Sequence, residues 1–170
     1  SERLMEPGVR LVSYDPDSVI KVAGAMLFSH GNKSLTDLWQ HCRRLPDEEI
    51  ARILDAGCNA RENRRQKSPR ALEHANFTFE IISDFGVYRD LHRHRMLTQE
   101  RQLLCCDYGY YIPPEIVDTD LEGEYTSAMQ KAKEVYDTIA AELPEEAQYA
   151  VPMAFHVRWY FHVNLRALQW

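Results

Sequence analysis

The most regular alternation of apolar and polar residues lies near the end of the chain. Apolar side chains occupy every second position from 153 to 163, namely Met153, Phe155, Val157, Trp159, Phe161 and Val163. Mostly polar residues fill the positions between them, namely Ala154, His156, Arg158, Tyr160, His162 and Asn164. Because successive side chains of a strand point to opposite faces, this period predicts a strand with one apolar and one polar face. A helix is expected to begin at Asn164.

Two further segments have the period of a strand. Residues 9–14 alternate over a short length. Residues 76–82 place Phe77, Phe79 and Ile81 on one side and polar residues on the other. Both patterns are typical of half-buried strands.

Helical spacing and capping residues predict a group of helices before residue 60. Asp15 is expected to cap a helix with Pro16 in its first turn, and Gly31 is expected to end it. The apolar face of this helix would carry Val19, Ile20, Ala23, Met26 and Leu27. A second helix is predicted over residues 34–42. A third begins at Pro46, followed by acidic residues that suit the positive end of a helix.

The later part of the chain predicts one short and one long helix. Asp84 is expected to cap a helix over residues 85–95 that carries basic residues near its end. A structural interpretation of residues 98–100 is that they cap or continue a helix. Residues 105–120 have the composition of a loop. A long helix follows over residues 122–142, with a buried stripe of Tyr125, Met129, Ala132, Val135, Tyr136 and Ile139. Together these elements predict a single α+β domain over residues 1–170, with a mixed or antiparallel sheet and long helices.

Composition and charge disfavour several classes of protein. The 170 residues carry a formal net charge of −6, which disfavours a general nucleic-acid-binding protein. No apolar run approaches the roughly 20 residues that span a membrane. The cysteines are Cys42, Cys58, Cys105 and Cys106, and they form no C-x-x-C pair. Free thiols in a reducing, cytoplasmic compartment are the simpler interpretation.

Positive charge is nevertheless concentrated in two groups. The first contains Arg61, Arg64, Arg65, Lys67 and Arg70, and the second contains Arg89, Arg93, Arg95 and Arg101. Arg93 and Arg95 flank His94, and guanidinium groups so close repel one another unless an anion lies between them. The cluster suggests a site for a phosphate-bearing ligand. A solvated basic face is the alternative interpretation of the same residues.

Histidines offer a rival interpretation, a metal site. His92 and His94 form an H-x-H pair, and His156 and His162 share a face of the last predicted strand. On a helix, residues two apart point about 200° apart, which suits one metal ion poorly. No cysteine or acidic pair completes a ligand set, so no metal is expected. The chain also lacks the G-x-S-x-G, phosphate-loop and G-x-G-x-x-G motifs of other ligand-binding folds.

Three blocks of the chain resemble the flavin-dependent thymidylate synthases, also called thymidylate synthase complementing proteins. Residues 72–81, Leu-Glu-His-Ala-Asn-Phe-Thr-Phe-Glu-Ile, resemble the family's E-H-x-x-F-T-F strand. Arg93-His94-Arg95 has the spacing of the R-H-R signature, and Thr98 takes the place of a family Ser. Residues 164–168, Asn-Leu-Arg-Ala-Leu, are similar to the N-x-R-S/A-L segment. The resemblance covers roughly residues 9–170.

The resemblance implies a cofactor, a fold and a reaction. FAD would be contacted by His74, Arg93, His94, Arg95, Thr98, Asn164 and Arg166. The nucleotide substrate would be contacted by Arg93, Glu100 and Arg101. Family members form homotetramers with active sites shared between subunits. They transfer a methylene group from methylenetetrahydrofolate to dUMP, with reduced flavin as hydride donor and NADPH as its reductant. No catalytic nucleophile of the protein is expected, since the cofactor and the positioning of the reactants carry the chemistry.

The substrate-facing positions depart from the family pattern. Leu103 and Cys105 stand where the family has the Ser and Arg that hold the substrate phosphate. Arg101 stands where the family has a Glu, Asp90 where it has a Gln, and Gln148 where it has an Arg. A second family Arg motif falls beyond residue 170. Residues 93–104, Arg-His-Arg-Met-Leu-Thr-Gln-Glu-Arg-Gln-Leu-Leu, resemble a divergent branch of the family in which this domain occurs twice in a longer chain. The chain is therefore expected to be truncated at its C-terminus.

Three hypotheses follow. The first is a flavin-dependent enzyme of the thymidylate synthase type that acts on dUMP or a related nucleotide. The second is a non-catalytic family member that binds flavin or nucleotide and has a structural or regulatory role. The third, from composition alone, is an interaction domain with a basic patch and no cofactor.

Overall fold

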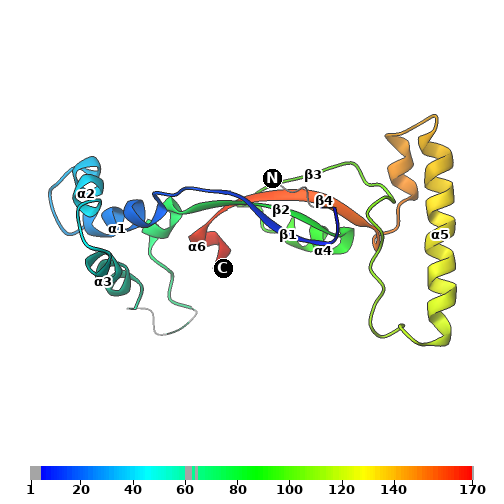
Figure 1. Cartoon of the computed structure of the whole chain (residues 1–170), viewed down its shortest axis with the longest axis horizontal. Coiled ribbons are helices and arrows are strands. Elements are labelled where there is room, and N and C mark those ends of the chain that lie inside the picture. The colour runs from blue at the N-terminus through cyan, green and yellow to red at the C-terminus, as the bar shows by residue number, and fades with distance from the viewer. Residues whose placement is uncertain (1–4, 60–62, 64, 170) are drawn as a thin grey trace. The chain divides into compact units, whose positions relative to one another are not determined.

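Four strands and six α-helices make up the regular structure of the described residues. The computed structural model describes residues 5–59, 63 and 65–169. The strands form one antiparallel sheet in the order β1-β2-β4-β3 (Figure 1). The α+β class with an antiparallel sheet is thereby confirmed. Two residues of the first basic group, Arg61 and Arg64, lie outside the described residues.

The elements follow one another in a fixed order along the chain. They are β1 (Gly8–Tyr14), α1 (Ser18–Phe28), α2 (Leu35–Cys42), α3 (Asp47–Cys58), the 3-10 helix η1 (Arg70–His74), β2 (Asn76–Asp84), α4 (Phe85–Leu91), β3 (Thr98–Arg101), α5 (Asp120–Ala140), the 3-10 helix η2 (Glu146–Ala150), β4 (His156–Asn164) and α6 (Leu165–Leu168).

The chain divides into two compact units. Unit 1 comprises Ser1–Arg10 and Phe79–Phe161, and unit 2 comprises Leu11–Thr78 and His162–Trp170. Each unit has a hydrophobic core of its own.

The core of unit 1 is built on the apolar face of β4, as the alternating pattern predicted. Val157 and Trp159 are buried together with Ile81, Tyr88 and Leu104. The indole nitrogen of Trp159 donates a hydrogen bond to Ser83 Oγ at 3.1 Å, so this large side chain is buried without an unsatisfied donor. The predicted strand was too long at its start, because residues 153 and 154 lie in a turn before β4.

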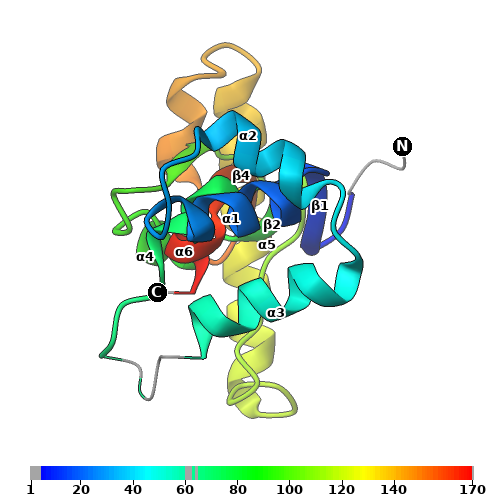
Figure 2. The ribbon, with the colours of Figure 1, turned by 90° about the vertical axis from the view of Figure 1, so that its left-hand side faces the viewer.

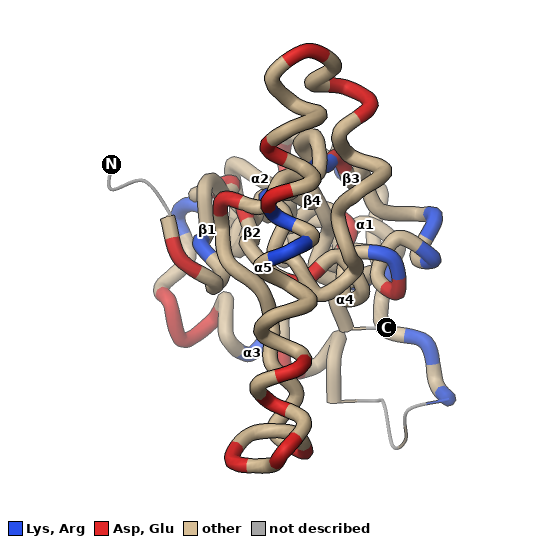
Figure 3. The backbone as a smooth tube through the Cα atoms, turned by 90° about the vertical axis from the view of Figure 1, so that its right-hand side faces the viewer, with Lys and Arg blue, Asp and Glu red and all other residues tan. Residues whose placement is uncertain are grey.

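Unit 1 also contains the long helix α5, which lies beside η2 (Figure 1). The predicted stripe keeps its helical spacing, but Val135 is 45% exposed and the other stripe residues are only half-buried. No residue of α5 is buried, so the prediction that this stripe is buried was wrong. The other faces of α5 are strongly charged, with acidic residues outnumbering the basic ones (Figure 3).

Unit 2 contains α1, α2 and α3, which pack together around small cores (Figure 2). One core is formed by Ala23, Cys42 and Ile50. The predicted helix at residues 34–42 is confirmed, with Ser34 as its N-cap accepting a hydrogen bond from Asp37 N. The predicted third helix is present as α3, which begins at Asp47, one residue later than predicted, with Pro46 as its N-cap.

The predicted boundaries of α1 were wrong at both ends. The Asp15 carboxylate accepts a hydrogen bond from Asp17 N, and Asp15 O accepts one from Ser18 N. These bonds form a turn, so the helix begins at Ser18 instead of Pro16. It ends at Phe28, before Gly31 is reached. Its buried residues are Val22, Ala23 and Gly24, whereas Val19 is 53% exposed.

Candidate functional site

The Arg93-His94-Arg95 cluster lies in turns after α4, and the prediction that it lies on the helix was wrong. Asp84 caps α4 as predicted, but the helix ends at Leu91. Gln99 Nε2 donates to Leu91 O at 3.0 Å and so satisfies a carbonyl at the helix end. Residues 98–101 then form β3, which the sequence did not predict. The cluster is therefore held between a capped helix end and a strand.

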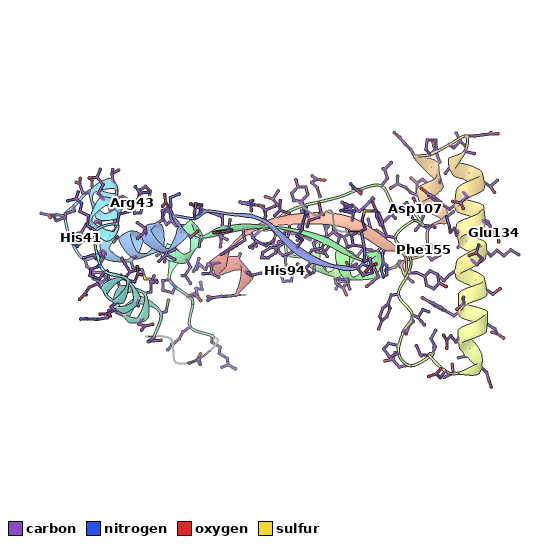
Figure 4. The ribbon with its side chains drawn as sticks, viewed as in Figure 1. His41, Arg43, His94, Asp107, Glu134 and Phe155 are labelled. Carbon is purple, nitrogen blue, oxygen red and sulfur yellow. The ribbon has the colours of Figure 1, made fainter. Side chains whose placement is uncertain are left out.

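The side chains of the cluster are exposed to solvent. Arg93 forms an ion pair with Asp90 at 3.2 Å, and both side chains are more than 70% exposed. Such a pair contributes only about 0–1 kcal/mol, so a better anion can displace it. The side chain of Arg95 forms no ion pair or hydrogen bond among the described residues. His94 lies between them in the same exposed turn (Figure 4). The turn therefore presents two guanidinium groups that a phosphate-bearing ligand can reach.

The neighbouring histidine is engaged differently. The His92 ring lies against the Tyr88 ring, with 5.4 Å between their centroids. The H-x-H pair lies after the helix end and not on a helix, so the helical angle of about 200° between residues two apart does not apply to it. Within the described part of the chain, no group of three or more His, Cys, Asp and Glu side chains could hold a metal ion.

A second group of predicted site residues lies on β3. Thr98 and Glu100 are exposed there. Arg101 is also exposed, but three groups restrain it. Its Nη1 donates to Gln102 O at 2.9 Å and to Gln148 Oε1 at 3.2 Å. Its guanidinium carbon lies 5.5 Å from the centre of the Phe85 ring.

Arg101 lines a pocket of about 360 Å³ in unit 1. The other lining residues are Leu104, Glu145, Glu146, Gln148 and Tyr149. The pocket thus combines one cation, two carboxylates, an amide and an aromatic ring. These groups can hydrogen-bond and stack against a polar ligand of moderate size.

The predicted site residues of unit 2 are brought together from opposite ends of the sequence. Arg166 Nη1 contacts Glu73 Oε1 at 2.6 Å, and Arg166 Nε donates to Ser68 O at 2.9 Å. Arg70 also contacts Glu73, and these two guanidinium groups, Arg70 first, hold the pKa of the Glu73 carboxyl below its usual value. Asn164 caps α6 by accepting from Ala167 N at 2.8 Å. The E-H and N-x-R blocks are therefore neighbours in space.

His74 lies at the edge of a larger pocket of about 480 Å³ in unit 2. Aliphatic and aromatic residues of α1 and α2 and the η1 residues around Glu73 line the rest, namely Ala25, Phe28, Leu35, Arg70, Ala71 and Glu73. The His74 ring meets the Trp39 ring edge to face, with 6.0 Å between centroids. The imidazole is thus oriented by an aromatic neighbour beside a cavity.

Comparison with known proteins shows what this arrangement is similar to. The chain matches the Thy1 family, described as thymidylate synthase complementing protein, over residues 10–170. The chain belongs to this family. The resemblance of the three sequence blocks is thereby confirmed.

Relatives and solved structures support the same grouping. The chain is 55% identical to a UPF0159 protein of Chlamydia pneumoniae and 34% identical to one of Thermoplasma acidophilum, over 99% and 92% of its length. It spans about a third, 32%, of the length of each relative. In fold it is similar to the UMP/dUMP methylase PolB from Streptomyces cacaoi, crystallised with 5-Br dUMP. That match has a TM-score of 0.66 at 18% identity and covers 97% of this chain and 76% of PolB.

Two positions at which the chain departs from the family pattern lack the hydroxyl group and the positive charge that would bind a phosphate. Leu103 is 55% exposed and apolar. Burial raises the pKa of the Cys105 thiol, and it raises the pKa of the adjacent Cys106 thiol to about 11. Both thiols are therefore neutral at pH 7, and neither supplies the positive charge of an Arg.

Sequence reasoning missed the burial of Arg158, on the polar face of β4. Arg158 is 6% exposed, contacts Glu80 at 2.8 Å and lies over the Tyr108 ring at 5.2 Å. The alternation of β4 placed Arg158 correctly opposite Trp159. It carried no information that Glu80 and Tyr108 would cover that face.

No helix in the described residues is long and apolar enough to span a membrane.

Proposed function

We propose that this chain is a flavin-binding domain of the thymidylate synthase type that methylates the pyrimidine of a uracil nucleotide such as dUMP. The observation that carries the proposal is the contact between the E-H and N-x-R blocks. Glu73 and Arg166 are 93 residues apart in sequence, yet they form an ion pair beside the His74 pocket. The one-carbon donor would be methylenetetrahydrofolate, and NADPH would reduce the flavin. The active protein would be a homotetramer, as the family resemblance implies, in the reducing cytoplasmic compartment that its free thiols suit.

The side chains fit the negative groups of FAD. Arg95 has no described partner for its charge, and Arg93 has only the exposed Asp90. Both can therefore donate charge-assisted hydrogen bonds to phosphate oxygens. Asn164 uses its carbonyl oxygen to cap α6, which leaves its amide N–H groups to donate to a ligand. His94, Thr98 and Arg166 complete the set that the resemblance assigns to the cofactor.

The protein's own part in the reaction would be positioning and charge stabilisation. Reduced flavin, when bound, supplies the hydride. Arg93, Glu100 and Arg101 would orient the nucleotide, and the cationic groups would stabilise negative charge that develops on the pyrimidine. Glu73 and Ser68 O hold Arg166 in a single orientation, so little entropy is lost when this side chain meets its ligand. Because active sites in the family are shared between subunits, these residues need not come from one copy.

A non-catalytic flavin- or nucleotide-binding domain is the second candidate. It is favoured by Leu103 and Cys105, which supply no charge or hydroxyl at positions where the family holds the substrate phosphate. A domain of this kind would bind the cofactor and contribute structure or regulation to a longer protein.

Tritium release from dUMP labelled at C5 separates the two candidates. The protein is incubated with FAD, NADPH and methylenetetrahydrofolate, and released tritium is counted. The enzyme hypothesis predicts release that requires both FAD and the folate, because methylation replaces the hydrogen at C5. Absence of release, together with FAD binding by titration, would favour the non-catalytic domain.

A further inference from the structure

The guanidinium group of Arg101 is held by hydrogen bonds at one nitrogen, and its other two nitrogens can donate to a ligand. Nη1 donates to Gln102 O and Gln148 Oε1, and the guanidinium carbon lies over the Phe85 ring. Neither Nε nor Nη2 has a hydrogen-bond partner or ion pair among the described residues. These two nitrogens form the edge that binds two oxygens of a phosphate at once. Restraint of an exposed arginine in this way lowers the entropy cost of binding such an anion.

Gln148 provides the side-chain hydrogen bond that restrains the Arg101 guanidinium group. Its Oε1 accepts from Arg101 Nη1 and from Leu104 N at 3.0 Å, and its Nε2 donates to Glu145 O at 2.9 Å. Three bonds fix the orientation of the amide. The acceptor oxygen is therefore held toward Arg101 by the backbone on both sides.

The pocket next to Arg101 contains carboxylates as well as this cation. Glu145 and Glu146 line it, but neither comes within ion-pair distance of Arg101 among the described contacts. The guanidinium is thus unneutralised although acids are near. The Glu145 backbone carbonyl is bonded to Gln148, which ties the start of η2 to the same amide. A guanidinium group that is oriented through one nitrogen and forms no ion pair is suited to an incoming oxoanion.

We infer that Gln148 is a positioning residue that holds Arg101 for bidentate binding of the nucleotide phosphate. Gln148 itself does not touch the ligand. The inference rests on the proposed function, since it assumes that a uracil nucleotide occupies this pocket. It adds a role to a position at which the family has an arginine.

The test compares UMP with uridine, which lacks the phosphate, by isothermal titration calorimetry of the whole chain. The ratio of the two dissociation constants measures what the phosphate contributes. Gln148→Ala is expected to lower this ratio about tenfold, the effect of weakening one charged hydrogen bond, and to leave uridine affinity unchanged. Gln148→Glu places a carboxylate that pairs with Arg101, has no donor for Glu145 O and repels the phosphate, so it is expected to lower the ratio at least as much as Gln148→Ala. Gln130→Ala, an exposed glutamine of α5, is the matched control and should match the wild type.

The possible results separate failure of the inference from failure of the proposed function. If wild type prefers UMP and Gln148→Ala keeps the same ratio, the positioning role is wrong and the proposed function stands. If wild type binds neither UMP nor dUMP more tightly than the corresponding nucleoside, the nucleotide reaction and the inference both fail. A loss of affinity for uridine and UMP alike would show a merely structural role. If Gln148→Ala does not fold, Arg101→Lys keeps the charge but removes the fork, and an unchanged ratio in that variant overturns the inference.

Discussion

At the scale of single residues, the best-defined electrostatic feature is Glu73 between two arginines. Arg70 and Arg166 both bond its carboxylate and lower its pKa. A carboxyl group with a lowered folded pKa stabilises the protein at neutral pH, and this contribution is lost as pH falls through the folded pKa. The same carboxylate orients Arg166, so it connects stability to the proposed cofactor site.

Glu73→Gln is therefore expected to destabilise the chain near pH 7 and to matter less in acid. The difference in unfolding free energy between wild type and variant should shrink as pH falls below about 4.3, the ordinary pKa of glutamate. Urea unfolding at several pH values measures it. Glu134→Gln, on the exposed α5 position labelled in Figure 4, is the control and should show little difference at any pH. A Glu73→Gln difference that stays constant from pH 7 to pH 3 would contradict the ion-pair account.

At the scale of elements, strands and capped helices could be predicted from the sequence. The end of α4 before Arg93-His94-Arg95 and the strand β3 after it could not. The period of β4 and the Ser34 cap are local signals, so the sequence alone contains them. The end of α4 depends on Gln99 reaching back to Leu91 O from β3, a contact that no local pattern encodes. The half-buried stripe of α5 likewise depends on what covers that face.

Two glycines give a matched test of the backbone geometry. Gly123 lies in α5 with open space around an added Cβ, so Gly123→Ala is expected to stabilise the chain by about 0.5–1 kcal/mol. Gly109 has φ of +74°, so Gly109→Ala is expected to destabilise it by about 1–2 kcal/mol. Thermal or urea unfolding of both variants measures the opposite signs. Equal effects would contradict the assigned backbone at one of the two positions.

At the scale of the whole molecule, family membership was accessible from sequence because three motifs occur in order along the chain. The division into two units was not, since β1, β2 and β4 each have residues in both units and no linker marks a boundary. The pairing of Arg101 with Gln148 was also hidden. Both were recognised as departures from the family pattern, but 47 residues separate them and only the fold shows that they touch.

FAD titration, followed by quenching of flavin fluorescence, tests the central claim most directly, because the claim is that the guanidinium groups of Arg93 and Arg95 bind the phosphates of this cofactor. Wild type is expected to bind FAD and become yellow. Arg93→Ala and Arg95→Ala should each weaken binding by about 1.5–3 kcal/mol, roughly 10- to 150-fold. Arg52→Ala, on an exposed arginine of α3 in unit 2, should bind like wild type. A wild type with no affinity for FAD, or two arginine variants that bind it normally, would contradict the account.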